Sequence, residues 1–213
     1  GTYFGMKKSM EPLHVMYSYN TNSVNIINSM LQAFNGLKVK ATVYNLDGTQ
    51  KFNKEVTINV AGDGTKQCFV LPTVTGLSDV YFVRLELKNA AGKVESINWY
   101  WLSAKKDELN WKKSTWYYTP QSAFADYSPL GGMPKTTLSV THTSGGDKAM
   151  PTHQIIIKNT GKAVAFFVHI RALKEKGGED ILPVIFGDNY ISLAPGESRT
   201  IKCSYESKDA GNG

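Results

Sequence analysis

Short segments in which apolar and polar residues alternate, separated by turn residues, run through most of the 213-residue chain. The clearest is residues 37–44, which read LKVKATVY. This alternation places successive side chains on opposite faces of a β-strand. No long stretch has the i, i+3, i+4 spacing of an amphipathic helix, and only residues 29–34 and 105–111 could form a helical turn or two. The chain is therefore predicted to be all-β.

Residues 13–104 form the first predicted domain. Turn signals recur about every 8–12 residues, which is the spacing expected of a β-sandwich. Asp47-Gly48 indicates a tight hairpin of type I′, in which both central residues need positive φ. About seven strands are expected, at residues 13–19, 23–28, 37–44, 56–60, 67–71, 81–88 and 94–102.

Residues 136–206 form a second predicted sandwich. Ala194-Pro195-Gly196-Glu197 suits a type II turn, because proline sets φ at its second position and glycine supplies positive φ at its third. The expected strands are 138–142, 153–159, 163–173, 181–186, 190–193 and 198–205. Residues 1–12 lack strand periodicity and are interpreted as the end of a helix or as a lead-in from an upstream region. Residues 207–213 are interpreted as a polar, frayed tail.

A connector, residues 105–135, lies between the two predicted domains. It is rich in aromatic residues with little alternation, whereas a flexible linker would be polar or rich in Gly and Ser. Aromatic groups at this density need burial, so we expect the connector to pack onto one or both domains. The predicted architecture is two tandem immunoglobulin-like β-sandwich domains joined by an aromatic-rich ordered connector.

Composition excludes several classes of protein. The net charge is +6, but the lysines are scattered and do not form the aromatic-interleaved stripe of a nucleic-acid surface. No apolar run approaches the roughly 20 residues of a membrane span, and no signal peptide is recognisable. The two cysteines, Cys68 and Cys203, fall in different predicted domains and are interpreted as free thiols.

No catalytic, cofactor-binding or metal-binding residue is predicted. The acidic residues lie in turns or at outward strand positions, whereas a glycosidase needs two carboxylates across a sugar site. The four histidines are widely spaced, each on a predicted strand, and no nucleophile motif or metal-ligand spacing accompanies them. They are His14, His142, His153 and His169. The glycines sit singly in turns, so no phosphate-binding loop is present.

One group of aromatic residues has two interpretations. A flat ring matches the apolar face of a sugar, so these residues could form a carbohydrate-stacking platform. They could instead be buried at a domain interface, and this is favoured because two of them share one face of the strand that enters the connector. The group comprises Trp99, Trp101, Trp111, Trp116, Tyr117 and Tyr118.

Several motifs together resemble the C-terminal β domains of glycoside hydrolase family 2, closest to its exo-β-glucosaminidase and β-mannosidase-like branch. The segment 10–15 (MEPLHV) and the segment 43–48 (VYNLDG) are similar to the β domain that follows the catalytic barrel. Segments 100–103 (YWLS), 116–120 (WYYTP) and 124–126 (FAD) resemble the connector there. Segments 165–168 (AFFV), 182–184 (LPV), 188–190 (DNY) and 193–198 (LAPGES) resemble the last immunoglobulin-like domain.

The resemblance implies a non-catalytic role. Both catalytic glutamates of that family lie in a (β/α)₈ barrel, and the acid/base follows an Asn, yet this chain has no Asn-Glu dipeptide. The resemblance therefore implies accessory domains that brace the absent barrel of a larger exo-acting retaining glycosidase, with residues 1–12 leading in from that barrel. The parent is expected to be periplasmic or secreted. The alternatives are a carbohydrate-binding module that binds oligosaccharide, or a cell-surface interaction protein.

Overall fold

The computed structural model describes residues 1–211, which divide into two compact units. One unit is Lys7–Pro134, and the other combines Gly1–Met6 with the chain from Lys135 onward. Helix α1 (Thr2–Ser9) occupies most of the segment interpreted as a helix end or lead-in. The helical turn expected at residues 29–34 is wrong, because this segment is an irregular bend before the next strand.

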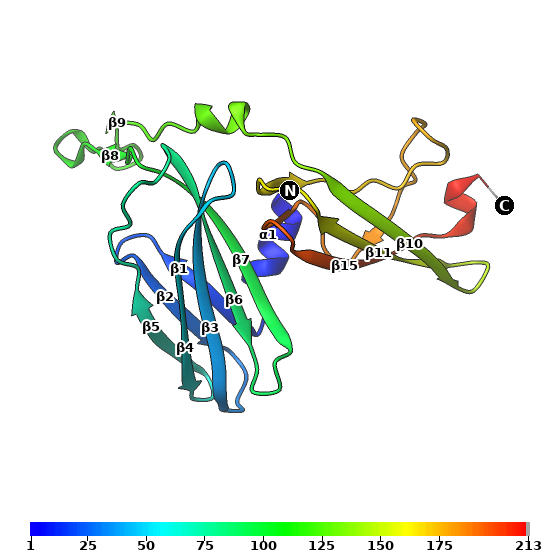
Figure 1. Cartoon of the computed structure of the whole chain (residues 1–213), viewed down its shortest axis with the longest axis horizontal. Helices are drawn as coiled ribbons and strands as arrows, with labels where there is room; N and C mark the ends of the chain where they lie inside the picture. Colours follow the sequence, from blue (N-terminus) through cyan, green and yellow to red (C-terminus); the bar gives the residue numbers. More distant parts are fainter. Residues whose placement is uncertain (212–213) are drawn as a thin grey trace. The chain divides into compact units, whose positions relative to one another are not determined.

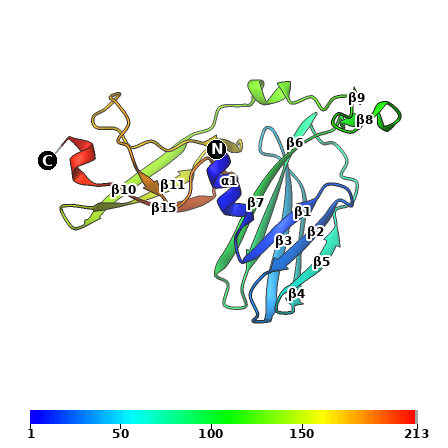
Figure 2. The same cartoon turned by 180° about the vertical axis from the view of Figure 1, so that it is seen from behind.

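The unit Lys7–Pro134 is a sandwich of two antiparallel sheets, as predicted. One sheet has the order β1-β2-β5 and the other β4-β3-β6-β7, and the two views show each set of strands side by side (Figures 1 and 2). The seven strands match the seven predicted segments. They are β1 (Leu13–Ser18), β2 (Ser23–Asn28), β3 (Phe34–Asn45), β4 (Gln50–Val60), β5 (Gly64–Val70), β6 (Val80–Lys88) and β7 (Val94–Ser103).

Aliphatic side chains from alternate strand positions form the core of this unit. Val15 and Ile26 from one sheet and Val39 and Leu85 from the other are completely buried. The alternation in residues 37–44 has this cause, because Leu37, Val39, Ala41 and Val43 all belong to the core. Burial on one face therefore fixes the register of β3.

The two turn predictions have different outcomes. At residues 45–49 only Gly48 has positive φ, at 87°, and Asn45 pairs with Thr49 beyond it. This is a three-residue hairpin loop and not the predicted type I′ turn. The type II turn is confirmed: Gly196 has φ 78° and the Glu197 amide donates to the Ala194 carbonyl at 3.0 Å.

The connector has regular local structure. Strands β8 (Glu108–Leu109) and β9 (Gln121–Ala123) pair antiparallel, and the short helices η1 (Trp111–Lys113) and η2 (Ser128–Gly132) lie between and after them. The Asn110 amide donates to the Pro120 carbonyl at 2.8 Å. The connector is thus an ordered segment, as the predicted fold requires.

The second unit is a smaller sandwich. Its sheets have the orders β10-β11-β15-β13 and β12-β14, and its core contains Ile157, Leu193 and Ile201. Its elements are β10 (Leu138–Gly146), β11 (Pro151–Asn159), β12 (Ala165–Val168), β13 (Ile185–Phe186), β14 (Ile191–Leu193), β15 (Ser198–Ser204) and η3 (Ser207–Ala210).

Three predictions for this unit are wrong. The strand predicted at 181–186 is limited to β13, and residues 181–184 form no strand. The long strand at 163–173 is limited to β12, because Phe167 adopts a left-handed φ of 55° and Asn189 then bonds both backbone groups of Ile170. His169 consequently lies outside any strand. The expected frayed tail begins with η3 instead, and residues 212–213 lie outside the described residues.

Candidate functional site

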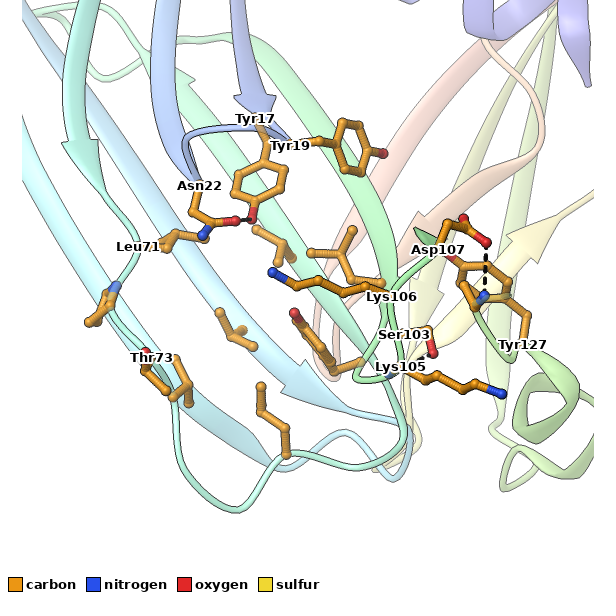
Figure 3. A pocket seen from close by; sticks show the side chains of 18 residues that line it. Tyr17, Tyr19, Asn22, Leu71, Thr73, Ser103, Lys105, Lys106, Asp107 and Tyr127 are labelled. Carbon is orange, nitrogen blue, oxygen red and sulfur yellow. Dashed lines mark hydrogen bonds between the residues drawn. The ribbon is translucent and has the colours of Figure 1, made fainter. Parts of the chain in front are cut away.

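A cavity of about 490 Å³ opens at one end of the first sandwich (Figure 3). Its walls come from the end of β1 and the turn after it, the segment after β5, β6, and the chain that leaves β7 into the connector. All of these residues belong to the unit Lys7–Pro134. This volume lies within the range of roughly 300–1,000 Å³ that is typical of small-molecule sites.

The cavity exists because the chain leaves the sheet here. After β5, Pro72 lacks an amide hydrogen for strand pairing, and the next strand begins only at Val80. Hydrogen bonds hold this irregular segment in place: the Leu71 amide donates to the Asn22 carbonyl at 2.8 Å, and Asn45 bonds Gly76 and Ser78 through its side chain. The wall is therefore fixed by polar contacts and not by a strand.

Four tyrosines line the cavity. Tyr17 is buried and donates a 2.7 Å hydrogen bond from its hydroxyl to the side-chain oxygen of Asn22, as Figure 3 shows. Tyr19 is 66% exposed and Tyr127 is 40% exposed. Tyr81 lies between these extremes. Burial, and then the neighbouring Tyr81 and Tyr19, raise the pKa of Tyr17 to about 12, so its phenol stays protonated at neutral pH.

The charged groups of the cavity come from three consecutive residues. Lys106 extends across the cavity beneath Tyr17, whereas Lys105 turns away from it (Figure 3). The Asp107 carboxylate accepts a 2.8 Å hydrogen bond from the Ala125 amide. Among the described lining residues Asp107 is the only carboxylate, so this cavity lacks the acid pair that glycoside hydrolysis needs.

The predicted aromatic group is divided, and none of its members lines this cavity. Trp99 and Trp101 lie on one face of β7, as the alternation predicts. Trp99 stacks on Tyr44 with ring centroids 6.1 Å apart and meets Phe82 edge-on. Trp101 is only 38% exposed.

The connector members of the group are exposed. Trp111 is 70% exposed, Trp116 93%, Tyr117 74% and Tyr118 58%. The Trp116 and Tyr117 rings contact each other edge-on at 4.9 Å. These four side chains are therefore exposed within the unit Lys7–Pro134, and their burial against another domain stays a prediction. An exposed apolar cluster of this kind commonly marks a binding surface.

Hydrogen bonds around His14 form a structural network. The Ser96 hydroxyl donates to the Glu11 carboxylate at 2.6 Å, and His14 lies between Glu11 and the Asn98 side chain. Although burial opposes it, hydrogen bonds from His14, Lys8 and Ser96 lower the pKa of Glu11. A hydrolytic triad is not formed, because the serine bonds the carboxylate and not the histidine.

Sequence reasoning missed a pair of histidines in the second unit. His142 Nε2 and His153 Nδ1 lie 2.7 Å apart, and Tyr205 stacks on the other side of His153. The strand register that pairs Ser144 with His153 brings them together. Among the described residues, no group of three His, Cys, Asp or Glu side chains could hold a metal ion.

Both thiols are free. Cys68 is half-buried in one unit and Cys203 is buried in the other. Burial raises the pKa of Cys68 to about 11 and also raises that of Cys203, so neither thiol is activated. Among the described helices, none is long and apolar enough to cross a membrane.

Two family models match the chain in succession. "Mannosidase Ig/CBM-like domain" matches residues 20–107, and "Exo-beta-D-glucosaminidase Ig-fold domain" matches residues 116–212. An exo-β-D-glucosaminidase of Streptomyces avermitilis is 42% identical over 98% of this chain. The chain matches the immunoglobulin-fold domains of exo-β-D-glucosaminidases.

Further relatives agree with this match. An exo-β-D-glucosaminidase of Hypocrea jecorina is 37% identical over 92% of this chain. The solved exo-chitosanase of Amycolatopsis orientalis, in complex with PNP-β-D-glucosamine, is 40% identical over 98% of this chain, with a TM-score of 0.90.

The matched region is only part of each relative. The chain spans 24% of the Streptomyces protein and 25% of the solved exo-chitosanase chain. It therefore corresponds to the immunoglobulin-fold, accessory part of such glycosidases, and the sandwich architecture expected from the sequence is confirmed.

Proposed function

We propose that these two units are non-catalytic accessory domains of a larger exo-acting, retaining glycosidase of the β-glucosaminidase or β-mannosidase type. Their role is to brace a catalytic barrel on the same polypeptide. The observation that carries this proposal is the coverage: nearly the whole chain aligns, yet it spans only about a quarter of the relatives' length. The relatives are named exo-β-D-glucosaminidases, so the parent is assigned an aminosugar substrate. We also propose that the parent is periplasmic or secreted.

The side chains of the described units support a non-catalytic role. The main cavity holds one carboxylate, Asp107, and this carboxylate already accepts an amide hydrogen bond. The Glu11 carboxylate is bonded to both His14 and Ser96, so these groups connect segments of the fold to one another. Neither place supplies the acid and nucleophile pair of a retaining glycosidase.

The exposed aromatics of the connector support the bracing role. Four aromatic residues of the connector each expose more than half of their surface in this chain: Trp111, Trp116, Tyr117 and Tyr118. Burying rings of this size would lower the free energy of the protein. We propose that residues 105–135 act as a connector whose aromatic surface is covered by the barrel. About three-quarters of the relatives' length is available to supply that cover.

The same exposure supports a second candidate, a carbohydrate-binding module that stacks sugar rings on these aromatics. A titration of tryptophan fluorescence with chitosan and mannan oligosaccharides separates the two. A saturable change that is lost in Trp116→Ala favours the module. A flat response favours bracing.

Hydrolysis tests the principal proposal. The isolated chain should release no p-nitrophenol from PNP-β-D-glucosamine above the buffer rate, while the full-length parent should release it. Saturable turnover by the isolated chain would contradict a non-catalytic role. Equal heat resistance of the parent with and without these units would contradict bracing.

A further inference from the structure

We propose that the tyrosine-lined cavity of the first unit binds a neutral oligosaccharide, with sugar rings packed on Tyr19 and Tyr127. This site is separate from the exposed connector aromatics, and it does not depend on the bracing role. A unit that carried such a site would attach the parent enzyme to neutral or N-acetylated polysaccharide as well as supporting it.

The lining of the cavity suits a sugar. It includes the buried aliphatic side chains of Val43, Val83 and Leu102. Asn22, Thr73 and Ser103 contribute polar groups to its walls. The lining is thus mixed, with polar and apolar surface in similar amounts, whereas sites for small organic ligands usually combine apolar side chains with a few polar groups that fix orientation. The apolar C–H face of a pyranose and its surrounding hydroxyls match this arrangement.

Two tyrosines present ring surface at the mouth of the cavity. Tyr19 is 66% exposed, but its ring is held by edge-on contacts with Tyr17 at 5.5 Å and Tyr100 at 5.9 Å. Tyr127 presents a second partly exposed ring (Figure 3). Because Tyr19 is fixed before a ligand arrives, little conformational entropy is lost on binding. The phenol hydroxyls can also donate to and accept from sugar hydroxyls.

The charged side chains of the cavity should make it bind some sugars more tightly than others. The Lys106 ammonium extends into the space where a ligand would lie (Figure 3). An ammonium donates hydrogen bonds to sugar hydroxyls but repels the protonated amine of glucosamine. The Asp107 carboxylate offsets part of this repulsion, but Lys105 and Lys106 outnumber it, so the charged lining residues carry a net positive charge. The cavity therefore favours a neutral or N-acetylated sugar over the cationic aminosugar for which the relatives are named.

Calorimetric and NMR titrations of the 213-residue chain test this proposal. The probes are cellobiose, mannobiose, N,N′-diacetylchitobiose and the glucosamine dimer, at a pH where the dimer is protonated. At least one neutral probe should bind with a dissociation constant on the order of 1 mM, and the glucosamine dimer should bind roughly tenfold more weakly. The absence of binding by all neutral probes, or stronger binding of the glucosamine dimer, would overturn the proposal.

Variants locate the binding. Tyr19→Ala and Tyr127→Ala should each weaken binding of the neutral probe roughly tenfold, and Lys106→Met should reduce the discrimination against the glucosamine dimer. Trp116→Ala tests the connector as the alternative site, and Tyr3→Ala is the matched control, because it removes an exposed tyrosine ring outside both places. Unchanged melting temperatures show that each variant is folded. If Trp116→Ala weakens binding as much as the two tyrosine variants do, the ligand binds at the connector and the proposed cavity site is refuted.

Discussion

His142 and His153 share a single hydrogen bond, with His142 Nε2 and His153 Nδ1 2.7 Å apart and the two rings stacked at a centroid distance of 5.0 Å. One ring must donate and the other must accept, so the pair tolerates at most one added proton. Burial and then the charge on His142 lower the pKa of His153 from its ordinary value of 6.5. His153 also pairs across the strands with Cys203, stacks on Tyr205, and has the Ser144 hydroxyl 3.4 Å from its Nδ1 atom.

Acid should therefore destabilise the second unit. The unfolded chain takes up a proton on His153 near pH 6.5, while the folded unit resists it. The stabilising contribution is complete above that pH and is lost as the pH falls through the lowered folded pKa. The melting temperature of this unit should drop between about pH 7.5 and pH 5. His142→Gln should make the drop smaller, and an identical pH profile in that variant would contradict this account.

Asn159 is predicted to be the most sensitive polar residue of the second unit. It is completely buried, its amide donates to the Ala163 and Leu193 carbonyls, and its oxygen accepts from Thr136 and Gly161.

Asn159→Ala removes the side chain that bonds these four groups. The variant should therefore lower the free energy of unfolding by about 2–4 kcal/mol. Gln154→Ala, at an exposed position on the same strand, should change it by less than about 0.5 kcal/mol. Denaturant titration measures both, and equal effects would refute the prediction.

Gly62 should not tolerate a side chain. A Cβ atom there would lie 1.9 Å from the Leu31 carbonyl oxygen, which is a backbone atom and cannot rotate away. Gly62→Ala should therefore destabilise the first unit by about 2 kcal/mol or more. Gly131→Ala is the control, because its Cβ would meet nothing within 4 Å. Equal melting temperatures for the two variants would show that the segment at Leu31 can move freely.

The strands of this protein were predictable because one face of each sheet is buried. The alternation at residues 37–44 follows directly from the burial of Leu37, Val39, Ala41 and Val43. The strand predicted at 163–173 ends at Val168, directly after Phe167 adopts a left-handed φ, and such a φ leaves no signal in the apolar pattern.

The cavity was not predictable from local patterns. Tyr17 and Tyr81 lie on strands of different sheets, and Tyr127 lies in the connector, so only the three-dimensional fold brings them together. The histidine pair likewise depends on the register between β10 and β11. For the connector, the density of aromatic residues led us to expect buried side chains. No part of the described unit Lys7–Pro134 covers them, because Trp111, Trp116, Tyr117 and Tyr118 are exposed there.

The most direct measurement is the effect of Trp116→Ala on thermal stability in two settings, the isolated chain and the full-length parent. Trp116 is 93% exposed in this chain, so the isolated chain should lose less than about 0.5 kcal/mol. If the barrel covers this ring, the parent should lose about 2–4 kcal/mol and inactivate at a lower temperature. An unchanged parent would contradict the account.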